Sequence, residues 1–349
     1  MTVINAKTYK PKFDEARRAI GRAIVGNDEA VLFTFVALLC NKPMLLTSHR
    51  GRGKTALAKA FHEVISGATH ARLQCTPEMM PGDITGRKIF DEELRKFLVE
   101  LSKAMTSEVV LMDEINRMLE ESQAALMELF EEGEVTIDGT TYTLPELHLW
   151  ICTRNPDGQA GTFRLADPTR DRLIVDVEMK FPPRDAMNDL LANTEIHRGK
   201  SNLPAVFDKA EIKLMQDHND WMVHNAPLPV RNYVTALAEC LQTDGDVYQE
   251  LVLSAKTKAD GKRLGDMVGQ NIAELEVLED GLSPRAAIWM LHAACALAFI
   301  EGADEVTFEH VRRVFIPSAR HKLIMRSVAK SLGVRPEDIL NSALATVKY

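Results

Sequence analysis

A glycine-rich run from Ser48 to Thr55 contains the residues with the clearest chemical potential in this chain. It reads Ser-His-Arg-Gly-Arg-Gly-Lys-Thr and lies between a short apolar stretch, residues 43–47, and a stretch typical of the start of a helix. A strand, a glycine loop and a helix in this order predict a phosphate-binding site, because the backbone N–H groups of the loop and of the helix N-terminus point at one anionic position. We expect Lys54 to reach the β- and γ-phosphates and the Thr55 hydroxyl to bind Mg²⁺.

Close approach of a phosphate to the backbone explains the glycines of this run. Gly51 and Gly53 have no Cβ that would stand in the way. One position departs from the usual pattern G-x-x-x-x-G-K-[ST], because Ser48 stands where the pattern has glycine. A turn without a ligand is the alternative, which the flanking strand and helix disfavour. The predicted nucleotide contacts are Gly51, Arg52, Gly53, Lys54, Thr55 and Ala56.

Two carboxylates follow a strand-like run farther along the chain. The apolar residues 109–112 are followed by Asp113 and Glu114, and polar groups at the carboxyl ends of parallel strands face the ligand crevice of the sheet. We expect Asp113 to bind Mg²⁺, directly or through water, and Glu114 to polarise the water that attacks the γ-phosphate. The alternative interpretation is that Asp113 and Glu114 are two solvated charges at the end of a strand, and the presence of Lys54 and Thr55 in the same chain disfavours it.

Three more polar side chains are candidates for assisting the reaction. Asn155 ends another strand-like run and could position the attacking water, with a strand cap before Pro156 as the alternative. Arg170 and Arg172 precede a further strand-like run. An arginine on such a loop can stabilise transition-state charge, often on the nucleotide of a neighbouring subunit, and a surface salt bridge is the alternative.

Five short apolar runs are the candidate strands that position these groups. Helical stretches separate the runs, and strands that alternate with helices predict a parallel sheet covered on both faces. Within residues 134–144, the pair Asp138-Gly139 predicts a tight hairpin turn. The strand candidates are Met44–Thr47, Ala71–Cys75, Val109–Met112, Leu147–Thr153 and Leu173–Met179.

A change in pattern at the double proline Pro182-Pro183 predicts a domain boundary. Residues 1–183 are expected to form an α/β domain. Helical periodicity dominates residues 184–349, which are expected to form an all-helical domain. A chain of 349 residues is long enough for two domains.

The composition limits the classes of protein to consider. A net charge of −8 argues against nucleic-acid binding, whose footprint is usually basic. The five cysteines include no Cys-x-x-Cys pair, so neither a disulfide framework nor a zinc cluster is expected, which fits a reducing, cytoplasmic setting. The N-terminus does not read as a signal peptide, and the apolar run 286–300 is too short to span a membrane.

Together these segments resemble the MoxR family of AAA+ ATPases. The resemblance implies an α/β AAA+ P-loop NTPase fold with a five-stranded parallel sheet between helices and an all-helical C-terminal lid domain. It also implies an insert in the second helix at about residues 78–99 and a hairpin at 134–144 before the first sensor. In the family's order, the segments are Ile24–Asn27, Gly51–Thr55, Thr76–Gly86, Leu111–Arg117, Glu134–Gly139, Thr153–Pro156, Gly161–Phe163, Asp171–Arg172 and Ser283–Ala286.

The resemblance implies a role for each candidate residue. The arginine finger corresponds to Arg172, with Arg170 as a second candidate, and the second sensor corresponds to Arg285 in the lid. The Walker A pair, the Walker B pair and the first sensor correspond to Lys54, Thr55, Asp113, Glu114 and Asn155.

Some positions depart from the family pattern. His49 and Arg50 replace the usual prolines. Arg50 and Arg52 add positive charge near the predicted phosphates; solvation is the favoured interpretation, and tighter ATP binding is the alternative. Residues 243–278 look like an addition to the lid, and the tail 322–349 has no counterpart that we can match.

The implied function is ATP hydrolysis with Mg²⁺ in a ring oligomer, expected to be a hexamer. The resemblance further implies remodelling or maturation of a client protein, often a metalloenzyme, together with a partner that carries a von Willebrand factor A domain. A DNA-translocating motor is an alternative because helicase relatives share the two insertions, although the acidic charge counts against it. A nucleotide-gated scaffold that does not hydrolyse ATP is the other alternative, which the Asp113–Glu114 pair disfavours.

Overall fold

The computed structural model describes residues 3–156, 163, 165–192, 203–243, 248, 252 and 277–348. The chain divides into two compact units, Met1–His218 and Asn219–Tyr349. This division lies later than the predicted boundary after residue 183, which stays a prediction. The reason is that the chain returns to the first unit after the double proline: Ser66 donates its N–H to the carbonyl of Phe207 at 2.8 Å, and Gln216 donates to the carbonyl of Leu38 at 2.7 Å.

A five-stranded parallel sheet forms the centre of the first unit, as the sequence predicts. Its strand order is β2-β5-β8-β1-β9, and every pair is parallel. The middle strands are continuously apolar because helices cover both faces. The strands are β1 (Met44–Thr47), β2 (His70–Gln74), β5 (Val109–Asp113), β8 (Leu149–Arg154) and β9 (Asp176–Glu178).

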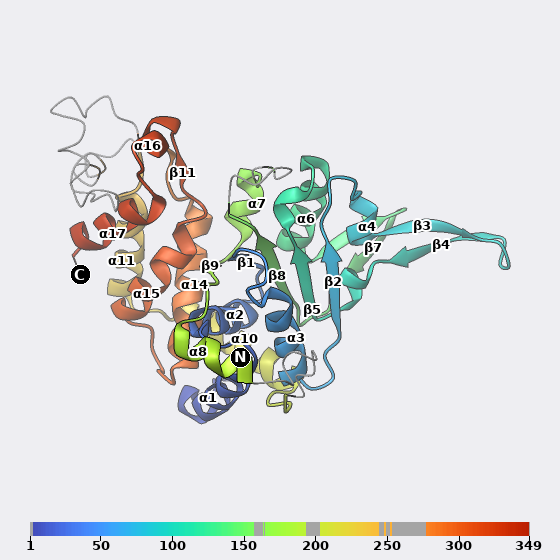
Figure 1. The fold of residues 1–349 in the computed structure, drawn as a ribbon, viewed down its shortest axis with the longest axis horizontal. Coiled ribbons are helices and arrows are strands. Elements are labelled where there is room, and N and C mark those ends of the chain that lie inside the picture. The colour runs from blue at the N-terminus through green and yellow to red at the C-terminus, as the bar shows by residue number, and fades with distance from the viewer. Residues whose placement is uncertain are drawn as a thin grey trace. The chain divides into compact units, whose positions relative to one another are not determined.

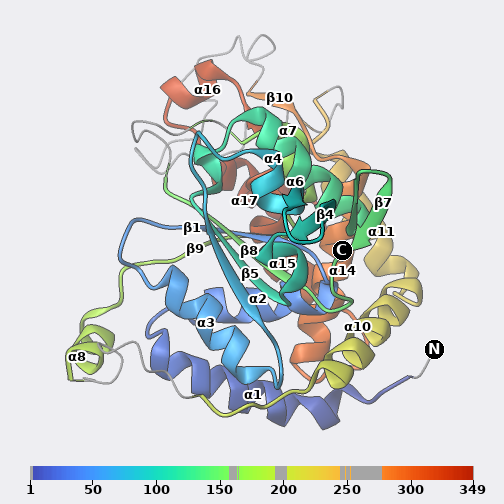
Figure 2. The ribbon, with the colours of Figure 1, turned by 90° about the vertical axis from the view of Figure 1, so that its right-hand side faces the viewer.

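Helices lie on both sides of this sheet (Figure 2). On one side, α1 (Ala6–Ala23) and α2 (Asp28–Cys40) pack with α3 (Lys54–Val64). On the other side, α6 (Glu120–Glu132) lies with α7 (Asp167–Arg172). The shorter elements are α4 (Pro81–Thr85), α5 (Lys103–Thr106), the 3₁₀ turn η1 (Ile115–Arg117) and α8 (Arg184–Ala192).

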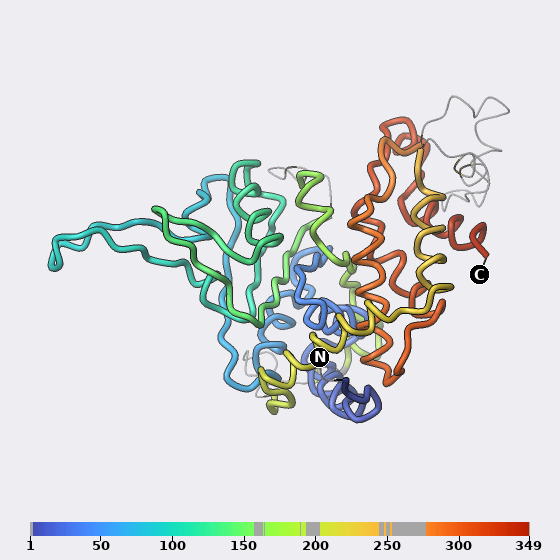
Figure 3. The backbone as a smooth tube through the Cα atoms, turned by 180° about the vertical axis from the view of Figure 1, so that it is seen from behind, coloured from blue at the N-terminus to red at the C-terminus, as the bar shows by residue number. Residues whose placement is uncertain are grey.

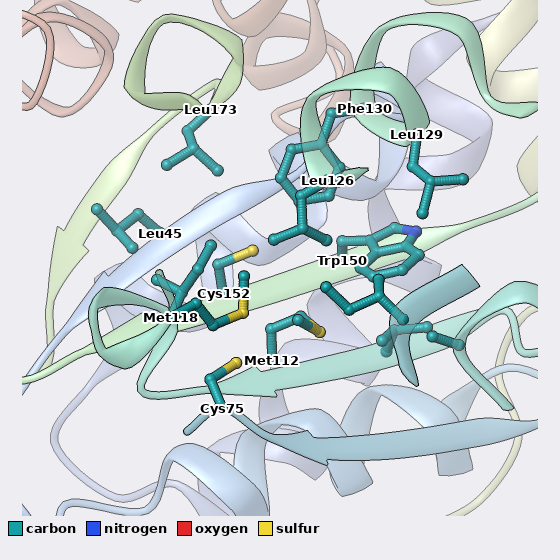
Figure 4. Close-up of a cluster of buried hydrophobic side chains, with 14 of the residues drawn as sticks. Leu45, Cys75, Met112, Met118, Leu126, Leu129, Phe130, Trp150, Cys152 and Leu173 are labelled. Atoms are coloured by element: carbon teal, nitrogen blue, oxygen red, sulfur yellow. The ribbon is translucent and has the colours of Figure 1, made fainter. Parts of the chain in front are cut away.

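A buried apolar layer joins α6 to the strands (Figure 4). The Trp150 ring on β8 meets the Phe130 ring of α6 edge to face, with centroids 5.6 Å apart. The Cys75 and Cys152 side chains belong to the same layer and are fully buried. All five cysteines are buried free thiols, so they act as small core residues.

Two antiparallel hairpins extend the first unit beyond the sheet (Figures 1 and 3). The predicted hairpin forms from β6 (Glu134–Ile137) and β7 (Thr140–Thr143). Asp138 and Gly139 have φ angles of 52° and 78°, which is the left-handed pair that a two-residue turn requires. A longer hairpin of β3 (Gly86–Asp91) and β4 (Lys96–Leu101) occupies most of the predicted helix insert.

The second unit is mainly helical, as expected for the lid. The apolar helix α14 (Pro284–Ile300) packs against α15 (Phe308–Ala319). A short ladder of β10 (Leu278–Asp280) and β11 (Ile324–Met325) was not expected. The other helices are α11 (Leu228–Glu239), α16 (Ser327–Ser331) and α17 (Pro336–Thr346), and α10 (Lys209–His224) spans the division between the units.

Three segments singled out in the sequence are only partly covered by the structure. Of the 243–278 addition, only residues 243, 248, 252, 277 and 278 are described, and Gly161–Phe163 lies outside the described residues except for Phe163. The tail 322–349 contains β11, α16 and α17. Across the described residues, no helix combines the length and apolarity needed to cross a bilayer.

Candidate active site

The glycine run forms a loop between β1 and α3. Gly53 is the residue before α3, with a φ angle of 90°, and Gly51 has a φ angle of 77°. These left-handed conformations favour glycine. Ser48 is buried and its φ is not positive, and it donates its N–H to the carbonyl of Arg154 at 3.0 Å. The backbone at position 48 therefore does not require glycine, and Ser48 extends the pairing of β1 with β8.

Lys54 is the first residue of α3, and its side chain is buried below the loop. Its Nζ lies 3.8 Å from Asp113 Oδ1 and donates to Asn155 Oδ1 at 3.4 Å. Burial lowers the pKa of Lys54 from its ordinary value, and the carboxylates of Asp113 and Glu114 oppose this change. Lys54 thus contacts two of the other predicted site residues and feels the charge of a third, Glu114.

Asp113 ends β5, with its carboxylate held by two donors. Arg72 Nη2 donates to Oδ2 at 2.7 Å, and Thr153 Oγ1 donates to Oδ1 at 2.8 Å. Burial alone would raise the pKa of Asp113, but these hydrogen bonds and the charge of Lys54 bring the pKa below its ordinary value. Asp113 is therefore a carboxylate at neutral pH.

The oxygen groups at this position fit Mg²⁺. Thr55 follows Lys54 in the first turn of α3 with its side chain exposed, and Asp113, 3.8 Å from Lys54 Nζ, supplies a carboxylate. Within the described ranges, no group of three or more His, Cys, Asp or Glu residues could hold a metal ion. Mg²⁺ is usually held by one or two carboxylates together with waters and substrate phosphates, so a dedicated protein cage is not needed.

Glu114 adopts a left-handed backbone conformation directly after β5. Its φ is 61°, which is uncommon for a residue with a side chain and typical of strained functional sites. Its N–H donates to Thr153 Oγ1 at 3.0 Å. Its carboxylate accepts hydrogen bonds from Asn155 Nδ2 at 2.7 Å and Arg117 Nη1 at 3.1 Å. Asn155 therefore bridges Lys54 and Glu114.

The described ion pairs of the two finger candidates, Arg170 and Arg172, are with residues outside this cluster. Arg172 forms an ion pair with Glu131 of α6 and donates to the carbonyl of Pro168 at 3.0 Å. Arg170 forms an ion pair with Asp167. Arg285 belongs to the second unit, just after the Ser283 cap of α14. The roles of these arginines stay predictions.

Sequence reasoning missed three contributors to the site: Arg72, Arg117 and Thr153. Thr153 carried a usable signal, because it is a polar residue near the end of an otherwise apolar strand. Arg72 carried none, because its contact with Asp113 depends on the pairing of β2 with β5. Arg117 lies in the segment Leu111–Arg117, where its residue type and spacing indicate no particular role.

Comparison with known proteins agrees with this geometry. Residues 43–175 match the model for the ATPase family associated with various cellular activities (AAA), and residues 273–343 match the model for the AAA lid domain. Chaperone MoxR1 of Mycobacterium tuberculosis is 27% identical, over 94% of this chain and 80% of that protein. Protein MoxR of Methylorubrum extorquens is 28% identical, over 89% of this chain and 87% of that protein. The chain belongs to the MoxR family of AAA+ ATPases.

Other similarities cover nearly the whole of this MoxR-family chain. The uncharacterized protein YeaC of Bacillus subtilis is 27% identical, over 97% of this chain and 95% of that protein. The crystal structure of a protein from Cytophaga hutchinsonii, classed as an ATPase, has a TM-score of 0.79 at 22% identity. The superposition covers 98% of this chain and 96% of the Cytophaga hutchinsonii chain, which supports the AAA+ fold.

Proposed function

We propose that this MoxR-family protein hydrolyses ATP with Mg²⁺ in the cluster of Lys54, Asp113, Glu114 and Asn155. The observation that carries the proposal is the Asn155 bridge. One amide accepts from the lysine of the phosphate loop and donates to the carboxylate that follows β5. Such a bridge couples phosphate binding to the position of the general base.

Each residue then has a distinct task. The backbone of Gly51–Ala56 and the Lys54 ammonium bind the phosphates. Thr55 and Asp113 would hold Mg²⁺, which when bound neutralises charge on the phosphate oxygens. Glu114 accepts the proton of the attacking water, and Asn155 keeps that carboxylate in place.

A ring oligomer, with a hexamer as the expected size, is part of the proposal. Arg172 serves as the arginine finger for the nucleotide of a neighbouring protomer, with Arg170 as the second candidate. In support, the described contacts of Arg172 are with Glu131 and Pro168 and not with the cluster around Lys54. Arg285 in the lid senses the γ-phosphate.

The work of the ring is chaperone-like remodelling or maturation of a client protein, with metalloenzyme activation as one form of it. In support, two of the similar proteins are Chaperone MoxR1 and Protein MoxR. A partner with a von Willebrand factor A domain and a cytoplasmic location belong to the same proposal.

Substitution Glu114→Gln tests the proposed chemistry. It keeps the size of the side chain but removes the base, and general acid–base catalysis is worth about 10²–10⁴-fold in rate. We expect the steady-state rate of ATP hydrolysis to fall by that factor while ATP binding remains. The matched control is Glu128→Gln, an exposed position on α6 that should keep the full rate.

Two results would contradict the proposal. A Glu114→Gln protein that hydrolyses ATP at the wild-type rate would exclude Glu114 as the base. A wild-type protein that binds ATP with no measurable turnover would favour the nucleotide-gated scaffold. The same assay with added DNA addresses the motor alternative, because a translocase would bind DNA in a salt-dependent way and respond to it.

A further inference from the structure

The guanidinium of Arg50 in the phosphate loop faces the proposed general base. Arg50 Nε lies 3.9 Å from Glu114 Oε1, which is an ion pair too long for a hydrogen bond. The Arg50 side chain is 76% exposed. Its position in the loop and its weak attachment leave it able to move when the charge in the crevice changes.

The other groups around Glu114 are held more firmly. Asn155 is buried and donates to Oε1 at 2.7 Å, and Arg117 donates to Oε2 at 3.1 Å. The second arginine of the loop, Arg52, donates to the carbonyl of Met179 at 2.7 Å. Arg50 is thus the loop arginine that contacts Glu114 without a hydrogen bond.

Asn155 and Arg117 each occupy a lone pair of the Glu114 carboxylate. The guanidinium of Arg50 occupies none, but it lies 3.9 Å from Oε1, where it competes with a water for approach to this oxygen. Release of one partner would correct this, and Arg50 is the partner whose release costs least, because exposed ion pairs are weak.

We propose that Arg50 is a positioning residue that leaves Glu114 for the terminal phosphate when a nucleoside triphosphate binds. The phosphate carries more negative charge than the carboxylate and binds beside Lys54 in the same loop. Burial and the charge of Arg50 both lower the pKa of Lys54, so Arg50 is close enough to act on that position. A diphosphate lacks the terminal group, so Arg50 stays with Glu114.

Two consequences follow from this exchange, which rests on the proposed function. Glu114 loses a cationic partner only when the γ-phosphate is present, so that the base is released together with substrate binding. Arg50 also favours triphosphate over diphosphate. Solvation of Arg50, the favoured interpretation from sequence, describes only the nucleotide-free state.

The test measures equilibrium binding with the full-length protein and Mg²⁺, by titration calorimetry with a non-hydrolysable ATP analogue and with ADP. A partly exposed charge-assisted hydrogen bond to phosphate is worth about 5- to 20-fold in affinity. We expect Arg50→Ala to weaken analogue binding by that factor and ADP binding by less than about twofold. Arg50→Lys should restore most of the analogue affinity.

A matched control comes from the neighbouring position in the loop. His49 is exposed like Arg50, and no described contact joins its side chain to Glu114. His49→Ala should therefore leave the ratio of analogue to ADP affinity unchanged. A ratio that falls equally in both variants would overturn the proposal, because the effect would then come from the loop and not from the guanidinium.

A double-mutant cycle with Glu114→Gln tests the exchange itself. In that background Arg50 has no carboxylate to leave, so the full gain from the phosphate contact appears. In the Glu114→Gln background, Arg50→Ala should weaken analogue binding about two- to fivefold more than it does in the wild-type background. This difference corresponds to the strength of an exposed ion pair. An equal cost in both backgrounds would refute the exchange.

The outcomes separate this inference from the proposed function. If the wild-type protein binds neither nucleotide, the proposed function fails. If the wild-type protein binds and hydrolyses ATP but Arg50→Ala keeps the ratio of affinities, only the role of Arg50 fails.

Discussion

Thr153 offers a sharp test of how the sheet positions the two carboxylates. Its hydroxyl is fully buried, donates to Asp113 Oδ1 at 2.8 Å and accepts the N–H of Glu114 at 3.0 Å. Thr153→Val keeps the shape of the side chain but removes both hydrogen bonds. The N–H of Glu114 then stays buried without a partner, next to a backbone already strained by its positive φ.

The expected cost follows from these two losses. A hydrogen bond to a charged acceptor contributes about 1.5–3 kcal/mol, and a buried unsatisfied N–H costs about 1–3 kcal/mol. Asp113 keeps the hydrogen bond from Arg72 and the nearby charge of Lys54, so we expect a net destabilisation of about 2–4 kcal/mol for Thr153→Val. Thr153→Ser is the control, because it keeps the hydroxyl and loses one buried methyl, at about 1 kcal/mol.

Amide hydrogen exchange measures this difference in stability within the first unit, which contains Thr153. The slowest amides of β5 and β8 report the opening of the first unit. The two variants should differ by about 1–3 kcal/mol, which is about 5- to 150-fold in the opening equilibrium. Equal protection in Thr153→Val and Thr153→Ser would refute the reasoning, since the hydroxyl would then contribute nothing to the site.

Two further predictions concern the stability of the first unit. Burial acts to raise the pKa of Glu108, but hydrogen bonds from Lys209 and Thr69 lower this pKa to about 2. The ionised carboxylate therefore stabilises the first unit at pH values above its ordinary pKa of 4.5, and this stabilisation is lost as the pH falls toward about 2. Glu108→Gln should flatten the unfolding free energy against pH in that acid range, and an unchanged slope would contradict the assignment. At Gly86, with a φ angle of 124°, an added Cβ would lie 2.6 Å from the carbonyl oxygen of Glu100, so Gly86→Ala should cost about 1–3 kcal/mol and speed proteolysis of the β3–β4 hairpin. Gly82→Ala is its control, because the nearest atom there is at an ordinary 3.7 Å, and equal cleavage of the two variants would contradict the prediction.

Much of the first unit could be read from the chain because its signals are local. Strands buried on both faces are continuously apolar, so β1, β5 and β8 were visible as apolar runs, whereas the edge strand β2 exposes His70, Arg72 and Gln74. Asp138-Gly139 marked its turn because few residue pairs accept two positive φ angles. The ladder of β10 and β11 carried no such signal, since strands of two or three residues are too short to show a period.

By itself the sequence determined the fold class and predicted the phosphate loop and the residues proposed to carry the chemistry, because these depend on residue type and short-range spacing. Only the tertiary structure decided which of these groups meet. Contacts such as Arg72 with Asp113, and Thr153 with both carboxylates, depend on strand order and register. Those are properties of segments about forty residues apart, which no local pattern encodes.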